Sequence, residues 1–204
     1  MCSGLPVALC PVLLALTAMQ EPQQVQQTEA GKKALAKIQE LGGLALELAQ
    51  NDSRLEVSYI QSDPKFSEAC LLPLKELKGL VHLNLRSQPV TDAQLAALKD
   101  ITSLTELHLE NTKITDKGMP YLKGLINLEY LNLYGTAVTD ASLANLEGMK
   151  KLKHLYLWQT KVSEAGAANL KKVLPGVDIN LGYREPPPKL EVKAQPKPAI
   201  EKKK

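Results

Sequence analysis

The sequence contains little cysteine, few aromatic residues and no apolar run long enough to cross a membrane. Its 204 residues include three cysteines, one tryptophan, one phenylalanine and six tyrosines. Cys2 and Cys10 lie in an apolar leader, so Cys70 is the only cysteine in the body of the chain, and an intrachain disulfide there is excluded. The absence of a C-x-x-C-H motif excludes covalent haem attachment. The short length and the lack of a glycine-rich nucleotide loop exclude a protein kinase.

Neither sign of charge is in large excess outside the C-terminal segment. The formal net charge is +3, and residues 184–204 carry seven Lys/Arg against three Glu, which is +4, so residues 1–183 sum to −1. This balance favours no nucleic-acid partner. We predict that 184–204, rich in Pro and Lys, is a disordered tail that makes at most weak electrostatic contact with anionic surfaces.

The N-terminal residues have the pattern of an export signal. The apolar run from Leu5 to Ala18 is about 14 residues long, which is too short to span a bilayer and typical of a signal-peptide core. We predict a signal peptide at 1–19, a Gln-rich linker at 20–29 and an extracytoplasmic location, in the periplasm, on the cell surface or secreted. The alternative is an uncleaved, disordered N-terminus.

The dominant feature of the remaining sequence is a 24-residue repeat. Leu80, Leu104, Leu128 and Leu152 each begin the pattern L-x-x-L-x-L-x-x-[TQ]-x-[VI]-[TS]-[DE]. A fixed period of this length is the signature of a leucine-rich-repeat solenoid, in which each unit is a strand, a turn and a helical return. The predicted fold is therefore an α/β solenoid with parallel strands on its concave face and helical returns on its convex face.

The ends of the array are predicted from weaker versions of this pattern. A helix is expected over 31–41, ended by Gly42 and Gly43, followed by strands at 44–48 and 55–59. We assign 30–54 to an N-terminal cap and 55–183 to the repeats, with a last strand at 177–181. The whole leucine-rich-repeat domain thus covers 30–183.

Two hydroxyl positions recur in the turns. The residue before each return is a good helix N-cap, and an acidic residue that suits a helix N-terminus follows it. These caps are Thr91, Thr115, Thr139 and Ser163, and Thr91 forms a capping box with Gln94. Position nine of each repeat is expected to bond neighbouring turn backbone. It is occupied by Gln88, Thr112, Thr136 and Thr160.

The strings LNLYGTAVTD and LYLWQTKVSEAG resemble bacterial extracytoplasmic leucine-rich-repeat proteins of the ribonuclease-inhibitor-like class. The likeness covers residues 30–183, and WQTKV is its most specific part. In that family such domains stand alone or beside c-type cytochrome or kinase modules, and they are taken to be interaction surfaces. The resemblance implies a non-catalytic binding module that needs no cofactor.

The strand pleat predicts which residues face a ligand. Counting from the first Leu of each repeat, positions four and six point inward, so positions three, five and seven face the concave side. Position three is occupied by His82, Glu106, Tyr130, His154 and Asp178. Position five is occupied by Asn84, His108, Asn132, Tyr156 and Asn180. Position seven is occupied by Arg86, Glu110, Tyr134, Trp158 and Gly182.

Half of the aromatic residues gather on two neighbouring strands of this surface. Tyr and Trp on a rigid face give a large contact area at low entropic cost, which is typical of binding sites. The predicted ligand-binding residues are Tyr130, Tyr134, Tyr156, Trp158, Arg86, Glu106, His108, Glu110, Asn132 and His154. The alternative is that aromatic side chains merely suit strands and cover the sheet.

Metal binding and catalysis are disfavoured. His82, Glu106 and His108 lie on adjacent predicted strands and can converge on a metal, but solvated or partner-contacting histidines are the favoured interpretation. Glu106 and Glu110 are two apart on one strand, yet varied charge is ordinary on a recognition surface. Cys70 falls on a return segment away from every histidine, so a Cys/His nucleophile has no support. No catalytic residue and no metal site are predicted.

The sequence thus favours an exported module that recognises a protein, a peptide or a glycan. One alternative is an intracellular adaptor similar to the leucine-rich part of ubiquitin-ligase substrate receptors, whose repeats carry I-T-D-x-G-L turns. Another is a structural spacer in an envelope assembly, anchored to anionic polymer by the Lys/Pro tail. An enzyme is the least favoured alternative.

Overall fold

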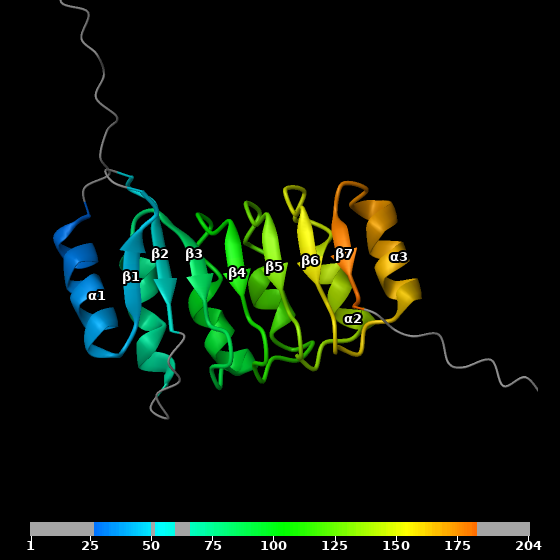
Figure 1. The fold of residues 1–204 in the computed structure, drawn as a ribbon, viewed down its shortest axis with the longest axis horizontal. Coiled ribbons are helices and arrows are strands. Elements are labelled where there is room, and N and C mark those ends of the chain that lie inside the picture. Colours follow the sequence, from blue (N-terminus) through cyan, green and yellow to red (C-terminus); the bar gives the residue numbers. More distant parts are fainter. Residues whose placement is uncertain (1–26, 50–51, 60–65, 183–204) are drawn as a thin grey trace, which may run out of the picture.

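The computed structural model describes residues 27–49, 52–59 and 66–182 (Figure 1). The predicted signal peptide, most of the predicted linker and the predicted C-terminal tail lie outside these residues. Gln27 and Thr28 already belong to the folded domain. The Gln27 side chain hydrogen-bonds to the backbone of Lys78, and the Thr28 hydroxyl accepts from Gly31 N–H at 3.1 Å to cap the first helix.

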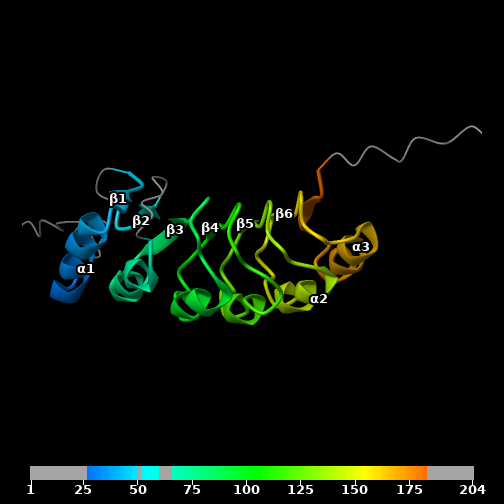
Figure 2. The same ribbon diagram turned by 90° about the horizontal axis from the view of Figure 1, so that it is seen from below.

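The strands form one seven-stranded sheet in chain order, β1 to β7. Their bounds are β1 Leu44–Glu47, β2 Leu55–Ser58, β3 Leu80–Asn84, β4 Glu106–His108, β5 Tyr130–Asn132, β6 His154–Tyr156 and β7 Asp178–Asn180. All neighbouring pairs from β2 to β7 are parallel. The array curves into a shallow arc with the strands on its inner side and the helices on its outer side (Figure 2). The predicted solenoid is confirmed.

The outer side is built mainly of short 3₁₀ segments. The helical elements are α1 Glu29–Glu40, η1 Glu68–Cys70, η2 Leu72–Glu76, η3 Asp92–Leu98, η4 Met119–Leu122, α2 Asp140–Leu143, η5 Ala144–Leu146 and α3 Glu164–Val173. A 24-residue repeat leaves few residues for the return, and 3₁₀ geometry is typical of such short pieces. Among the described residues, α1 and α3, at the two ends of the array, are the α-helices longer than one turn.

The N-terminal cap differs from the repeats in the direction of its strand. β1 pairs with β2 antiparallel, because the two strands are joined by a short connection, whereas a parallel pair needs a crossover of a dozen or more residues. Helix α1 lies beside β1 at this end of the array (Figure 1). Ala34 and Ile38 of α1 are buried against the core, so the helix shields the first repeat from water.

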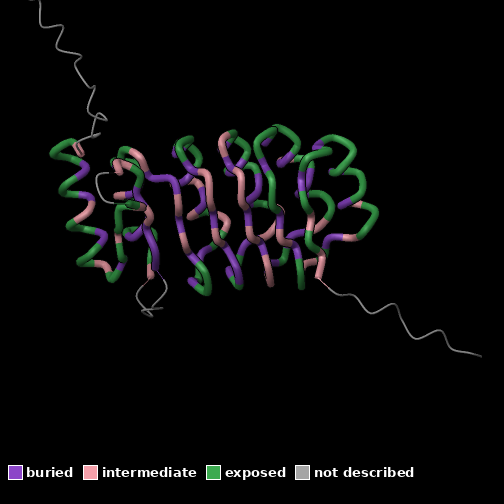
Figure 3. Tube along the Cα trace, turned by 45° about the horizontal axis from the view of Figure 1, so that its top comes forward, coloured by how far each residue is buried: buried purple, intermediate pink, exposed green. Residues whose placement is uncertain are grey.

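The core is one continuous column of aliphatic side chains. The inward pair on each central strand is almost completely buried: Leu83 and Leu85, Leu107 and Leu109, Leu131 and Leu133, Leu155 and Leu157. On β4 and β5 a buried residue lies between two half-buried ones, and exposed residues gather in the turns and on the helices (Figure 3). The pleat therefore assigns inward and outward positions as the sequence predicted.

An aspartate ladder links successive repeats along the outer side. Asp92 accepts hydrogen bonds from the backbone N–H and the hydroxyl of Thr115, at 2.7 and 2.6 Å. Asp116 does the same for Thr139, and Asp140 for Ser163, with distances of 2.6–2.7 Å. The acidic residue that the sequence assigned to its own helix terminus thus also binds the cap residue of the next repeat.

The position-nine threonines bond turn backbone, as predicted. The hydroxyls of Thr112, Thr136 and Thr160 donate to the carbonyl oxygens of Leu109, Leu133 and Leu157 at 2.6–2.7 Å. The preceding residue in each turn has a left-handed backbone with φ between 54° and 68°. These residues are Ser87, Asn111, Gly135 and Gln159. Each strand therefore ends in the same tight turn, which fixes where position seven leaves the sheet.

Candidate functional site

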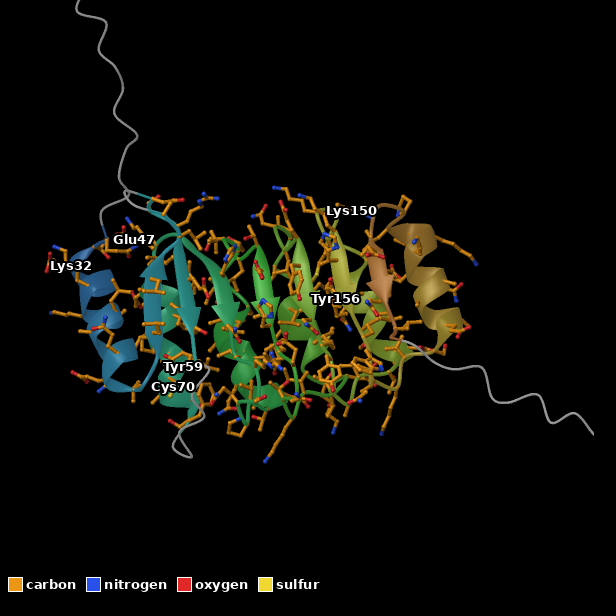
Figure 4. All side chains as sticks on the ribbon, viewed as in Figure 1. Lys32, Glu47, Tyr59, Cys70, Lys150 and Tyr156 are labelled. Carbon is orange, nitrogen blue, oxygen red and sulfur yellow. The ribbon has the colours of Figure 1, made fainter. Side chains whose placement is uncertain are left out.

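Strand register determines which side chains are neighbours on the concave face. His82 pairs with Glu106, Glu106 with Tyr130, Tyr130 with His154 and His154 with Asp178. The position-five residues pair in the same way, with Asn132 beside Tyr156. Adjacent strands lie about 4.8 Å apart, so equivalent positions of successive repeats form rows of neighbouring side chains. Tyr156 lies on the strand side of the array (Figure 4).

The four aromatic residues form an aromatic ladder, defined here as Tyr130, Tyr134, Tyr156 and Trp158. The ring centroids of Tyr130 and Tyr156 are 5.2 Å apart, and so are those of Tyr134 and Trp158. Their tilted geometry is within the range of favourable aromatic pairs. The tyrosines are half-buried, whereas Trp158 remains 47% exposed.

A glycine supports the outer end of the ladder. A Cβ atom built on Gly182 would lie 2.0 Å from a carbon of the Trp158 ring, so the indole lies directly against this residue. Gly182 also has φ = +73°, a conformation that side chains other than glycine rarely adopt. Only glycine at this position leaves room for the ring.

An imidazole bridges two carboxylates beside the ladder. His108 Nδ1 is 2.8 Å from Glu110 Oε1, and His108 Nε2 is 2.8 Å from Glu106 Oε1. His82 Nε2 lies 3.4 Å from the other oxygen of Glu106. The His108 ring also contacts Tyr130, with centroids 4.9 Å apart. We call Glu106, His108 and Glu110 the Glu-His-Glu bridge; it joins the polar and aromatic parts of the face.

The bridge changes the acidity of its histidine. Burial alone lowers the pKa of His108, but the hydrogen bonds and charges of Glu110 and Glu106 outweigh burial, so the pKa is raised above its ordinary value of 6.5. For the Tyr130 hydroxyl, burial acts in the opposite direction and raises the pKa, because it disfavours the charged phenolate. A larger fraction of His108 is therefore protonated at neutral pH than of an ordinary histidine.

Glu110 differs from the sequence expectation. It was predicted as an exposed polar residue of the face, but its side chain is only 8% exposed. One carboxylate oxygen, Oε1, contacts His108, while Oε2 is buried without a hydrogen-bond partner. Arg86, the equivalent residue one repeat earlier, is exposed and makes no ion pair with other residues in the described part of the chain. Position seven is thus not uniformly open.

The remaining predicted residues have different surroundings. Asn132 is half-buried, its Nδ2 lies 3.3 Å from the Tyr130 hydroxyl, and its Oδ1 accepts from Tyr134 N–H at 3.1 Å. His154 is exposed, with its ring 6.4 Å from that of Tyr130 and 4.0 Å from Asp178 Oδ2.

Strand register brings the predicted residues of positions three and five onto one face. Backbone hydrogen bonds from Ser87, Asn111 and Gly135 to the carbonyls of Glu110, Tyr134 and Trp158 place the position-seven residues in a row beyond the strand ends.

The histidines do not form a metal centre. Within residues 27–49, 52–59 and 66–182, no group of three or more His, Cys, Asp or Glu residues is arranged to hold a metal ion. His82, Glu106 and His108 do come together, but through the contacts of the bridge. Cys70 is buried in η1, and its carbonyl accepts from the Tyr59 hydroxyl at 2.8 Å.

Sequence reasoning missed two residues of this face. Leu44 and Leu46 pair with Ser58 and Glu56, so they lie on the concave side at the N-terminal end of the sheet. They are 53% and 51% exposed. The alternation in L-A-L-E was visible in the sequence, but it does not reveal which side of an antiparallel cap strand meets the core.

The described part of the chain contains no helix that is long and apolar enough to cross a membrane. Its curved sheet, its rows of equivalent positions and its 24-residue period define an α/β leucine-rich-repeat solenoid. Solenoids of this architecture are typically non-catalytic scaffolds that bind other proteins through their concave surface.

Comparison with known proteins agrees with this class. Residues 102–162 match the family model described as leucine rich repeat. A search of curated proteins finds no match.

Two solved structures from Listeria monocytogenes str. 4b F2365 are similar in part. An internalin (inlF) is 22% identical, with a TM-score of 0.46, over 56% of this chain and 32% of that chain. Internalin C2 (inlC2) is 26% identical, with a TM-score of 0.42, over 53% of this chain and 54% of that chain. The matches thus cover little more than half of this chain and at most about half of either internalin.

Proposed function

We propose that this chain is an exported binding protein that recognises a protein, a peptide or a glycan through its concave face. The aromatic ladder is the centre of the proposed site. The polar surroundings of the site are Arg86, Glu106, His108, Asn132 and His154. Glu110 is buried next to them and contacts His108. That the chain is a protein-binding module follows from the leucine-rich-repeat fold. The export, the ligand and the position of the site are what we propose in addition.

The observation that carries the proposal is the exposure of Trp158 within an ordered stack. The inward positions of the repeats are filled by leucine, so the core does not need the rings. Stacking against Tyr134 and Gly182 restricts the indole before a ligand arrives. A ring that is already ordered loses little conformational entropy on binding, which is why such residues dominate the free energy of many interfaces.

Export is proposed from the sequence alone. The apolar run from Leu5 to Ala18 supplies the argument, and it lies outside the described residues. An intact-mass measurement on protein isolated from the cell exterior tests this part separately. A mass matching cleavage near residue 19 is expected, whereas full-length protein retained in the cytosol would contradict export and favour the intracellular alternative.

The binding proposal is tested with three forms of the full chain as bait: wild type, Tyr156→Ala/Trp158→Ala, and Lys123→Ala. Lys123 is exposed and lies at the end of η4 on the convex side. The baits are incubated with surface and secreted proteins of the source cells and with a glycan array. We expect partners retained by wild type and by Lys123→Ala to be lost by the double variant. Equal retention by the double variant would refute the concave site.

A further inference from the structure

The concave face is acidic in a chain that is otherwise nearly balanced. Its outward positions from β2 onward carry Glu56, Glu106, Glu110 and Asp178 against one fixed positive charge, Arg86. With neutral histidines the sum is 1 − 4 = −3, whereas residues 27–183 carry 18 Lys/Arg and 18 Asp/Glu and sum to zero. The negative charge of the domain is therefore concentrated on the surface assigned to the ligand.

A buried carboxylate oxygen strengthens this negative field. Glu110 Oε2 is shielded from solvent and has no hydrogen-bond partner, and Glu110 has only His108 on its other oxygen. Water screens a charge less when it is buried, so this carboxylate acts on a group at the surface above it without touching that group. A protonated His108 neutralises only one of its two carboxylates, so the Glu-His-Glu bridge keeps a net negative charge.

The ring of Tyr130 lies next to the carboxylate of Glu106. Glu106 pairs in register with Tyr130, whose ring also stacks on His108. Glu106 is about one-third exposed, so a ligand can reach it. Oε1 of Glu106 already contacts His108, and Oε2 lies 3.4 Å from His82 Nε2. A guanidinium or ammonium group placed there would contact the exposed part of this carboxylate on one side and the Tyr130 ring on the other. Both contacts favour a cation, and a planar guanidinium fits them best.

We propose that the ligand of the concave face presents a cationic side chain, Arg or Lys of a peptide or protein, which binds Glu106 against the ring of Tyr130. This inference rests on the proposed binding function and narrows its ligand class. An anionic ligand could use Arg86 and the histidines, but it would lie beside the carboxylates of Glu106 and Glu110. The Glu-His-Glu bridge thus sets the sign of charge that the site accepts.

The probe is a displayed library of random 12-residue peptides, selected on the full-length wild-type chain. Binding of the enriched peptides, each labelled with a fluorescent dye, is then measured by fluorescence polarisation, because the double variant Tyr156→Ala/Trp158→Ala lacks the single tryptophan of the chain. The test variants are Glu106→Gln and Glu110→Gln, which keep side-chain shape and remove charge. The matched control is Glu147→Gln, an exposed residue on the outer side after η5.

We expect enrichment of Arg and Lys, a roughly tenfold or greater loss of affinity in Glu106→Gln, and no change in Glu147→Gln. Replacing the Arg of a selected peptide by neutral citrulline should cause a similar loss. Glu110→Gln should weaken binding less, because that carboxylate acts at a distance.

Other outcomes separate this inference from the binding proposal. Peptides that lack basic residues, bind Glu106→Gln normally and fail on Tyr156→Ala/Trp158→Ala would overturn the cationic ligand and leave the concave site standing. Enrichment of acidic peptides, or of no binder, would also overturn it. Peptides that bind the wild type and the double variant equally would refute both proposals.

Discussion

The aspartate ladder predicts that each repeat is tied to the next through one carboxylate, and Asp116 is the place to test it. Its two oxygens accept from the backbone N–H and the hydroxyl of Thr139, each at 2.7 Å. Replacing Asp116 by Ala removes both hydrogen bonds. It also leaves the N–H of Thr139 without its acceptor in a partly buried turn.

The expected loss follows from the strength of such contacts. A hydrogen bond to a charged group contributes roughly 1.5–3 kcal/mol, and partial exposure places these two toward the lower end. We expect Asp116→Ala to lower the free energy of unfolding by about 2–3 kcal/mol, equivalent to a fall in Tm of roughly 5–10 °C for a domain of this size. Asp116→Asn keeps an acceptor for the N–H and should lose about half as much.

The assay is urea unfolding followed by circular dichroism and Trp158 fluorescence. Glu164 is the matched control, because it occupies the same position in the last repeat and bonds no following repeat in the described structure. Glu164→Ala should cost less than about 1 kcal/mol, the usual worth of an acidic residue at a helix N-terminus. If Asp116→Ala and Glu164→Ala lose the same stability, the ladder does not couple the repeats.

Two further predictions concern the concave face. Because the pKa of His108 is raised on folding, its stabilising contribution should be fully present below about pH 6.5 and be lost as pH rises through the raised value. The Tm difference between wild type and His108→Gln should therefore shrink from pH 6.5 upward, and a difference that grows, or that His154→Gln reproduces, would contradict the bridge. Gly182→Ala should displace the Trp158 ring and shift its emission to longer wavelength, with a stability loss of about 1 kcal/mol or more from the positive φ. Gly148→Ala, which meets nothing within 4 Å, should change neither, and an unmoved emission in Gly182→Ala would contradict the packing of the indole.

The repeat in the sequence was sufficient to predict the fold and the composition of the concave face. A one-period shift between neighbouring strands follows from the phase of the leucines, and alternation along a strand follows from the pleat. Both are local properties that recur in every unit. The pairing of Tyr130 with His154 and the turn contacts of Thr136 could therefore be predicted without coordinates.

The cap strand could not be predicted in the same way. Leu44 and Leu46 alternate like core residues, yet they lie on the concave side. The direction in which β1 pairs decides its orientation, and that direction depends on the connection to β2 and on α1. No repeat phase constrains either, because the cap lies outside the periodic part of the chain.

By itself, the sequence determined the solenoid, its register and the rows of outward residues, because these depend only on a period and on strand geometry. The tertiary structure alone decided the burial of Glu110, the bridging of two carboxylates by His108 and the support of Trp158 by Gly182. Each depends on side-chain torsions and on contacts made after the repeats have stacked. The sequence lists the outward positions but not the side-chain torsions or the contacts between repeats. It therefore predicts which residues share the face, but not which of them are accessible or charged.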